Sequence, residues 1–301
     1  MWNCRRALPA DWPSLAPLVH QWNQRADGRV RCLHAEQGAT PEQQAESMRG
    51  LAADKAVFIV ASRRSNDAAI GGLAGATFDA AAGRAWVWGP LVDEQDDADA
   101  LRATLIDALR RALPQISRFD SFPQADEASL LRALEAAGFL HLQHHRVMAL
   151  EASDCPPASA VPIIDAGKTH PLLGELPELH DRLFPQTYLP GAALAASVDD
   201  AHRLLVAIAG GRLAGYVYVQ HQQVEGEGYV DYLGVAESAR GQGLGGALLT
   251  AAARWALIER ALPRLHLTVR QDKPVALRLY EGAGFREVAA GAHWMWQRAP
   301  A

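Results

Sequence analysis

The segment with the strongest chemical signal runs from Gly228 to Leu249. Within it, one arginine and four glycines fall in seven residues, Arg240-Gly241-Gln242-Gly243-Leu244-Gly245-Gly246. Glycines let a backbone adopt positive φ and approach a ligand closely, and the first N–H groups of a helix have no partner within it. The helix dipole and Arg240 add positive charge. The pattern predicts an anion site, with a pyrophosphate as its natural ligand; the alternative is a strand-to-helix turn that binds nothing.

A strand must lead into this loop and a helix must leave it, and the chain carries such a unit twice. A linker with three prolines, residues 151–162, divides the sequence near its midpoint. Leu131 to Phe139 matches Leu277 to Phe285 at an offset of 146 residues, each a helix that ends in Gly and then Phe. Each half is read as three strands, a helix, a strand, a helix and a last strand. We expect an α/β fold with a mixed sheet in each of two tandem domains, residues 1–152 and 160–301.

Composition limits the class of protein. The 301 residues are 49% hydrophobic and 21% charged, with a formal net charge of −5, which indicates a packed globular protein rather than a nucleic-acid binder. Cys4, Cys32 and Cys155 are too far apart for a disulfide framework, and no histidine cluster has ligands at metal-site spacing. No apolar run reaches membrane-spanning length. We expect a cytoplasmic protein with no metal and no membrane or nucleic-acid partner.

Two motifs give the second half a family resemblance. Arg240-x-x-Gly243-x-Gly245 resembles the Q/R-x-x-G-x-G/A motif of Gcn5-related N-acetyltransferases (GNAT), and Leu233-x-Val235 precedes it as in that family. The later helix, Ala276 to Phe285, resembles the family's Ala-x-x-Leu-Tyr-x-x-x-Gly-Phe signature. The resemblance covers roughly residues 160 to 298. A dinucleotide-binding fold is a weaker reading, because its six-residue glycine motif and later acidic residue are not matched.

The resemblance implies acetyl-CoA as the acyl donor. The amides of residues 242–246 would hold the pyrophosphate, and the backbone of Leu233 and Val235 would pair with the pantetheine arm and polarise the thioester carbonyl. Lys273 stands where the family often has Asn, and it either reaches a phosphate or is solvated. The expected donor contacts are Leu233, Gly234, Val235, Arg240, Gly241, Gln242, Gly243, Leu244, Gly245, Gly246 and Lys273.

The resemblance also implies two catalytic side chains. Tyr280 is similar to the family's general acid, which protonates the leaving thiolate; the alternative is an aromatic ring that only fills the core. The family places a base on the strand before the glycine loop. Because side chains alternate along a strand, residues 227, 229, 231, 233 and 235 should share one face, which favours Asp231 as base or amine anchor. Glu227 and Glu225 are alternatives, and a solvated carboxylate is the other reading of Asp231.

The first half departs from the family pattern. The loop that places Gln95 opposite Arg240 reads Asp93-Glu94-Gln95-Asp96-Asp97-Ala98-Asp99, whose carboxylates would repel a pyrophosphate. Pro90 has no N–H to donate, and Leu134 replaces the tyrosine. We expect a degenerate GNAT-like domain that binds no cofactor and covers the acceptor side of the second.

These observations predict an N-acetyltransferase that moves an acetyl group to a primary amine by direct attack, because no cysteine lies near the motifs. The acceptor would be a small molecule or a peptide, and the protein a monomer or weak homodimer. The alternatives are a non-catalytic acyl-CoA-binding regulatory module and an enzyme that uses a longer acyl-CoA.

Overall fold

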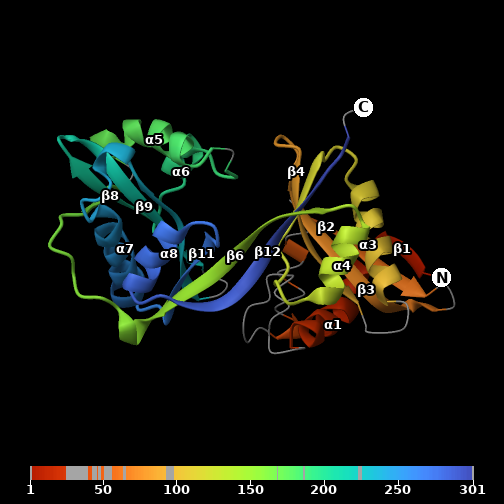
Figure 1. Cartoon of the computed structure of the whole chain (residues 1–301). Coiled ribbons are helices and arrows are strands. Elements are labelled where there is room, and N and C mark those ends of the chain that lie inside the picture. Colours follow the sequence, from red (N-terminus) through yellow and green to blue (C-terminus); the bar gives the residue numbers. More distant parts are fainter. Residues whose placement is uncertain are drawn as a thin grey trace. The chain divides into compact units, whose positions relative to one another are not determined.

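The chain divides into two compact units in a computed structural model that describes residues 2–24, 40–42, 46, 49–50, 56–63, 66–92, 98–167, 169–185, 187–222 and 226–299. Unit 1 comprises Met1–His145 together with Ala290–Ala301, and unit 2 comprises Arg146–Ala289 (Figure 1). The predicted domains, 1–152 and 160–301, differ from these units at the carboxyl terminus, because the last strand pairs within unit 1.

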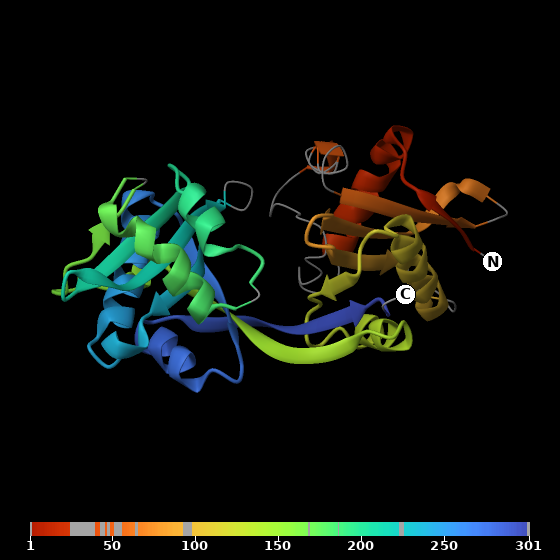
Figure 2. The ribbon, with the colours of Figure 1, turned by 90° about the horizontal axis from the view of Figure 1, so that it is seen from above.

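Unit 1 is a mixed sheet with helices on both faces. Strands β1 to β4 pair as antiparallel neighbours, β4 pairs with β5 in parallel, and β5 pairs with the end of β12. Helix α1 packs on one face around Leu15 and Phe58, while α3 and α4 pack on the other around Leu105 and Phe119 (Figure 2). The elements are β1 (Trp2–Arg6), η1 (Pro9–Asp11), α1 (Trp12–Gln24), β2 (Ala56–Arg63), β3 (Asn66–Asp79), β4 (Arg84–Val92), α3 (Ala98–Ala112), β5 (Arg118–Ser121) and α4 (Ala128–Ala136).

The edge of the unit 1 sheet is completed by the carboxyl-terminal strand. Strand β6 (Leu140–Glu151) begins in unit 1 and ends in unit 2, and β12 (Arg286–Gln297) runs from unit 2 back into unit 1. Trp294 to Gln297 pair with Ser121 to Arg118 of β5. The Arg298 Nε donates to the carbonyl of Ile116 at 3.1 Å. Residues far apart in the sequence therefore form one sheet.

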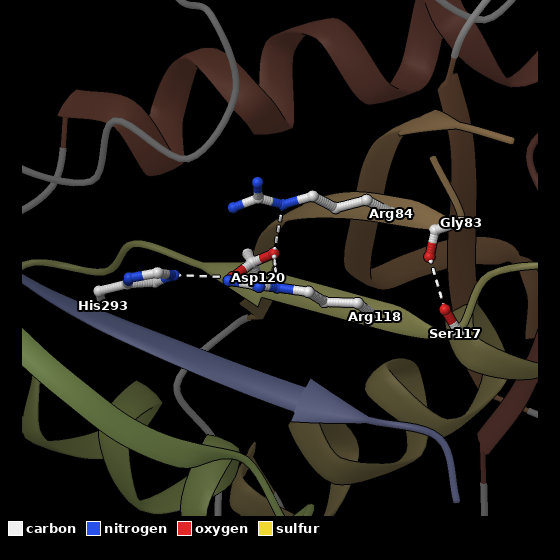
Figure 3. Close-up of polar contacts among 6 residues, drawn as sticks. All are labelled: Gly83, Arg84, Ser117, Arg118, Asp120 and His293. Atoms are coloured by element: carbon white, nitrogen blue, oxygen red, sulfur yellow. Dashed lines mark hydrogen bonds and ion pairs between the residues drawn. The ribbon is translucent and has the colours of Figure 1, made fainter. Parts of the chain in front are cut away.

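A buried carboxylate ties three strands of unit 1 together (Figure 3). Asp120 is fully buried and accepts hydrogen bonds from Arg84 of β4 at 2.7 Å, from Arg118 of its own strand at 2.8 Å, and from His293 of β12 at 2.7 Å. Burial opposes ionisation of Asp120, but these three donors together hold its pKa well below the usual range. The charge of Asp120 thus joins β12 to β4 and β5.

Unit 2 repeats the order of strands and helices seen in unit 1. Three antiparallel strands, β8 to β10, are followed by α7, β11, α8 and β12, which matches β2 to β4, α3, β5, α4 and β6. The predicted order of elements is confirmed, and Gly138 and Gly284 have φ of +79° and +94°. The elements are η2 (Ala152–Asp154), β7 (Ile164–Asp165), η3 (Pro171–Glu175), α5 (Leu176–Leu183), α6 (Gly191–Ala196), β8 (His202–Ala209), β9 (Arg212–Gln222), β10 (Glu227–Val235), η4 (Glu237–Ala239), α7 (Leu244–Arg254), a π-helical turn η5 (Trp255–Glu259), β11 (Arg264–Arg270) and α8 (Pro274–Gly282).

The two faces of the unit 2 sheet have different coverings. One face packs against α7 and α8 through a cluster that includes Val230, Leu248 and Leu277, which we call the α7 core. The other packs against α5 and α6 through a cluster that includes Leu179, Tyr216 and Tyr232, which we call the α5 core. In Figure 1, α5 and α6 lie above strands β8 and β9, and α7 lies below them. Strand β10 has residues in both cores.

Candidate active site

Strands β10 and β11 pair only at their beginnings. The parallel register covers Gly228 with Leu265, Tyr229 with His266, and Val230 with Leu267, and it ends there. Both strands continue beyond the last pair, β10 to Val235 and β11 to Arg270. On its other side, β10 stays paired with β9 as far as Val235. The backbone of residues 231–235 therefore has an edge toward β11 that is not closed by that strand.

A β-bulge in β10 is centred on Asp231. The register of β10 on β9 shifts between Val230 and Tyr232, so that Asp231 is the extra residue. Leu233 and Val235 consequently pack against the α7 core with Val230, whereas Tyr232 belongs to the α5 core. The expectation that odd-numbered residues 227–235 share one face is wrong, because the bulge reverses the alternation.

Asp231 nevertheless points to the α5 side of the sheet. Its Oδ2 accepts a hydrogen bond of 2.5 Å from the hydroxyl of Tyr188, which lies between α5 and α6. Burial raises the pKa of Asp231, while Tyr188 and, at longer range, His202 act in the opposite direction. A carboxylate with a raised pKa, on the strand that has the open edge, suits the role of base for a group that approaches that edge.

The predicted anion site has the backbone that the sequence pattern requires. Gly241 and Gly243 have φ of +77° and +76°, and Gly243 is the N-cap of α7. The first hydrogen bond of the helix runs from the Ala247 N–H to the Gly243 carbonyl at 3.1 Å. The amides of the three residues between them, Leu244, Gly245 and Gly246, have no acceptor within the helix. Three orphan N–H groups at a helix start can hold an anion.

The side chains around this loop leave it accessible. Residues 240–243 are exposed, and Arg240 makes no ion pair within the described part of the chain. A Cβ on Gly245 would lie 3.3 Å from Leu279 of α8 and 3.9 Å from Val235, so the start of α7 lies against both α8 and the open strand. Lys273 is exposed at the N-cap of α8. The loop, the open edge and α8 are therefore neighbours.

Packing requires glycine at position 234, and no sequence pattern indicated this. A Cβ at this position would lie 2.8 Å from Leu183 and 3.0 Å from Tyr216, both in or against the α5 core. A side chain there would push β10 away from α5. Glycine at 234 thus keeps the open edge of β10 in place, whether or not its own backbone touches a ligand.

Tyr280 is a partly buried phenol on α8. It packs against the α7 core together with Leu233 and Val235, and its ring centre lies 6.1 Å from that of Phe285. Burial raises its pKa to about 12. Its hydroxyl has no hydrogen-bond partner among the residues that the structure describes. Tyr280 is therefore a protonated O–H donor. It packs against the same core as Leu233 and Val235, which belong to the open edge of β10.

The alternative bases compare poorly with Asp231. Glu227 is 12% exposed and forms ion pairs with Arg264 at 3.6 Å and with His266 at 3.4 Å. Its carboxylate is thus already engaged by side chains of the neighbouring strand β11. Glu225 lies outside the described residues.

Unit 1 has different side chains at the corresponding places. The predicted acidic loop, residues 93–97, lies outside the described part of the chain, and Ala98 begins α3. Asp99 in the first turn of α3 forms ion pairs with Arg102 at 3.0 Å and Arg132 at 3.5 Å. Strand β4 continues past its last pair to Val92, but β5 ends at that pair, Ser121. The described residues therefore do not form the wedge of two continuing strands that β10 and β11 form.

Two classes of site find no support in the described residues. No group of three or more His, Cys, Asp or Glu side chains among them is arranged to bind a metal ion. None of the described helices has both the length and the apolar character needed to cross a bilayer.

Sequence comparison shows which proteins unit 2 is similar to. Residues 173–285 match the Acetyltransferase (GNAT) family. Mycothiol acetyltransferase of Clavibacter michiganensis subsp. michiganensis is 40% identical over 96 residues, 32% of this chain and 30% of that protein. An acetyltransferase of Pectobacterium atrosepticum is 34% identical over 89 residues, which are 30% of this chain and 61% of that protein. The similarity to the mycothiol acetyltransferases thus spans about three tenths of their length.

Solved structures match the whole chain in fold. A GCN5-related N-acetyltransferase from Sphaerobacter thermophilus superposes with a TM-score of 0.70 at 21% identity, covering 100% of this chain and 96% of that one. A tandem GNAT protein from the clavulanic acid biosynthesis pathway gives a TM-score of 0.66 at 15% identity, with 100% of both chains covered. Residues 173–285 therefore match the GNAT family of acetyltransferases, and the chain as a whole has the fold of tandem GNAT structures.

Proposed function

We propose that unit 2 transfers an acetyl group from acetyl-CoA to a primary amine by direct attack. The observation that carries this proposal is the open edge of β10 beside the start of α7. An open strand edge accepts an extended chain through main-chain hydrogen bonds, and a helix start with orphan amides accepts an anion. Acetyl-CoA has both parts, a pantetheine arm and a pyrophosphate.

The residues present fit this donor. The amides of Leu244, Gly245 and Gly246 would bind the pyrophosphate, and the exposed Arg240 would add a charge-assisted hydrogen bond. Gly241 and Gln242 bring the backbone to that point, and Lys273 would reach a phosphate from α8. The backbone of Leu233, Gly234 and Val235 would pair with the pantetheine arm, and one of its N–H groups would stabilise negative charge on the thioester oxygen.

Two side chains would move the protons. Asp231 would take a proton from the incoming ammonium, directly or through water, because its raised pKa makes it a better base than an exposed carboxylate. Tyr280 would donate its hydroxyl proton to the departing sulfur, since burial keeps the phenol protonated at neutral pH. As the carbon–sulfur bond breaks, the nitrogen bonded to the acetyl carbon loses its second proton, which returns through water to the Tyr280 phenolate. The products are the neutral acetamide and the free thiol of CoA, and the proton held by Asp231 passes to solvent.

The test is release of free thiol from acetyl-CoA in the presence of a panel of primary amines, with calorimetric binding of acetyl-CoA measured in parallel. Arg240→Ala should weaken binding, and Arg286→Ala, another exposed arginine of unit 2, is the matched control. Turnover with at least one amine supports the proposal. Tight binding without turnover would instead assign an acyl-CoA-binding module, and faster turnover with longer acyl-CoA would change the donor.

We further propose that unit 1 binds no acetyl-CoA. Its support is the paired Asp99 at the start of α3 and the absence of a strand wedge between β4 and β5 among the described residues. Calorimetry should give one acetyl-CoA per chain, and the Arg240→Ala variant should weaken that single site. A second site that survives this substitution would contradict the proposal.

A further inference from the structure

Asp231 lies at the base of a group of aromatic side chains. The bulge directs it and Tyr232 to the same side of the sheet. The Tyr188 hydroxyl donates to its Oδ2 at 2.5 Å, and the rings of Tyr188 and Tyr232 have centres 5.9 Å apart. Phe184 follows at 5.2 Å from Tyr232. The carboxylate is thus surrounded by ring faces and edges.

The segment that carries Tyr188 is held in place by the same tyrosines. Thr187 and Tyr232 share a hydroxyl–hydroxyl bond of 2.6 Å. The buried His180 bonds the Tyr216 hydroxyl through Nδ1 at 2.5 Å and the Leu189 carbonyl through Nε2 at 2.9 Å. Tyr188 itself keeps 55% of its surface exposed. Its ring is therefore accessible from solvent while its hydroxyl is directed at Asp231.

No cationic side chain contacts the Asp231 carboxylate within the described part of unit 2. Alternation puts three basic side chains of β11 on its side of the sheet, since Leu265, Leu267 and Val269 belong to the α7 core. Each has a carboxylate partner: Arg264 has Glu151 and Glu227, His266 has Glu227, and Arg270 has Asp272. His202 acts on Asp231 only at longer range and is bound to Asp199 at 2.7 Å.

An unbalanced carboxylate among aromatic rings is complementary to an alkylammonium ion, which it binds by a charge-assisted hydrogen bond while the rings contribute cation–π attraction. An acceptor with a carboxylate on its amine-bearing carbon would bring that carboxylate to about 5 Å from Asp231. At an effective dielectric constant of about 20, the repulsion between the two charges would weaken acceptor binding roughly a hundredfold or more. Because the basic side chains of β11 already have carboxylate partners, none of them is left to neutralise the second carboxylate.

We propose that this site selects primary alkylamines whose amine-bearing carbon carries no carboxylate, and that Tyr188 is a specificity-determining residue that binds the alkylammonium beside Asp231. The inference rests on the proposed acetyl transfer and narrows its acceptor class. α-Amino acids are then poor acceptors, while aliphatic monoamines, diamines and lysine-like side chains are good ones.

The experiment compares three acceptors of matched chain length: pentylamine, norleucinamide and norleucine. Norleucine carries the α-carboxylate, norleucinamide replaces it with a neutral group of similar size, and pentylamine lacks it. We expect the pH-independent kcat/KM for norleucine to be at least a hundredfold below that for pentylamine, with norleucinamide within about tenfold of pentylamine. Norleucine within threefold of norleucinamide would overturn the inference and leave acetyl transfer intact. Absence of turnover with every amine would instead refute the proposed function.

Two variants separate the roles of ring and charge. Tyr188→Ala should raise KM for pentylamine about tenfold and leave acetyl-CoA affinity unchanged, whereas Tyr188→Phe, which keeps the ring, should stay within about threefold. Calorimetry with CoA present gives acceptor affinity without turnover, and there Asp231→Asn should reduce the pentylamine-to-norleucine ratio from a hundredfold to less than tenfold. An unchanged KM in Tyr188→Ala, or an unchanged ratio in Asp231→Asn, would refute the assignment.

Discussion

Replacing Tyr280 by phenylalanine tests the proposed acid with little structural disturbance. The substitution keeps the ring that packs against the α7 core and removes only the hydroxyl. That hydroxyl has no partner among the described residues, so no internal hydrogen bond is lost and the free energy of unfolding should change by less than about 1 kcal/mol. The expected loss lies in kcat, about 10²- to 10⁴-fold for a general acid, or roughly 3–5 kcal/mol in the barrier.

The assay is thiol release at saturating acetyl-CoA and amine, with calorimetric acetyl-CoA affinity and thermal unfolding measured on the same preparation. Tyr216→Phe is the control for the loss of a bonded hydroxyl, because Tyr216 is fully buried and bonds His180. It should lower the free energy of unfolding by about 1–3 kcal/mol, since it leaves a buried imidazole nitrogen without a partner. A kcat for Tyr280→Phe within threefold of the natural protein would refute the acid role.

The pH dependence supplies a second readout for Tyr280. Burial raises its pKa to about 12, compared with roughly 10 for an unfolded tyrosine. An acid must be protonated, so kcat should not fall through loss of this proton below about pH 10. The raised pKa also contributes to the free energy of unfolding. This contribution is fully present below roughly pH 10 and is lost as the pH rises toward 12. A kcat that falls with an apparent pKa near 8 would assign the acid to another group.

Three further substitutions test other parts of the structure. Asp231→Asn should lower kcat/KM. It should also remove the part of the pH profile in which kcat/KM rises as the Asp231 carboxyl ionises, a carboxyl whose pKa is raised by burial. If the variant keeps that rise, the titrating group is not Asp231. Arg240→Ala should weaken acetyl-CoA binding about ten- to hundredfold, as one charge-assisted hydrogen bond predicts, without changing Tm, since the side chain is exposed; equal calorimetric affinities would remove Arg240 from the site. Asp120→Asn should destabilise unit 1 by about 3–5 kcal/mol in urea unfolding at neutral pH, because Arg84, Arg118 and His293 lose the buried anion that they share. Because the pKa of Asp120 is lowered, its ionised form contributes stability above about pH 4, and this contribution is lost as the pH falls. The difference in free energy of unfolding between the variant and the natural protein should therefore shrink in acid.

The glycine loop could be predicted from sequence because its geometry is local. Gly241 and Gly243 adopt positive φ, and Gly138 and Gly284 do so after their helices, as the spacing of glycine indicated. A residue's φ and the start of a helix depend on its immediate neighbours in the chain. The same reasoning found the strands that flank the loop, from β8 to β11.

The surroundings of Asp231 could not be predicted in this way. Alternation placed Leu233 and Val235 on its face of the sheet, but the bulge moves them to the other face. Tyr188 was not among the predicted residues, and it lies 43 positions from Asp231 in the sequence. A tyrosine in a stretch between helices has no distinguishing sequence pattern, because only the packing of α5 and α6 on β10 brings it to the carboxylate.

The last strand was also predictable as an element but not in its pairing. Sequence alone predicted a final strand near His293 to Gln297, and β12 includes these residues. It did not show that this part of the strand pairs with β5 of unit 1, or that His293 bonds Asp120 across 173 positions.

The sequence by itself determined the order of strands and helices, the repeat of that order, and the glycine-rich helix start with its arginine, because these follow from side-chain periodicity and local backbone preference. Only the tertiary structure decided which edge of β10 is open, which side chains surround Asp231 and which unit takes the last strand. Those features arise from contacts between residues far apart in the chain, whose free energies no local pattern records.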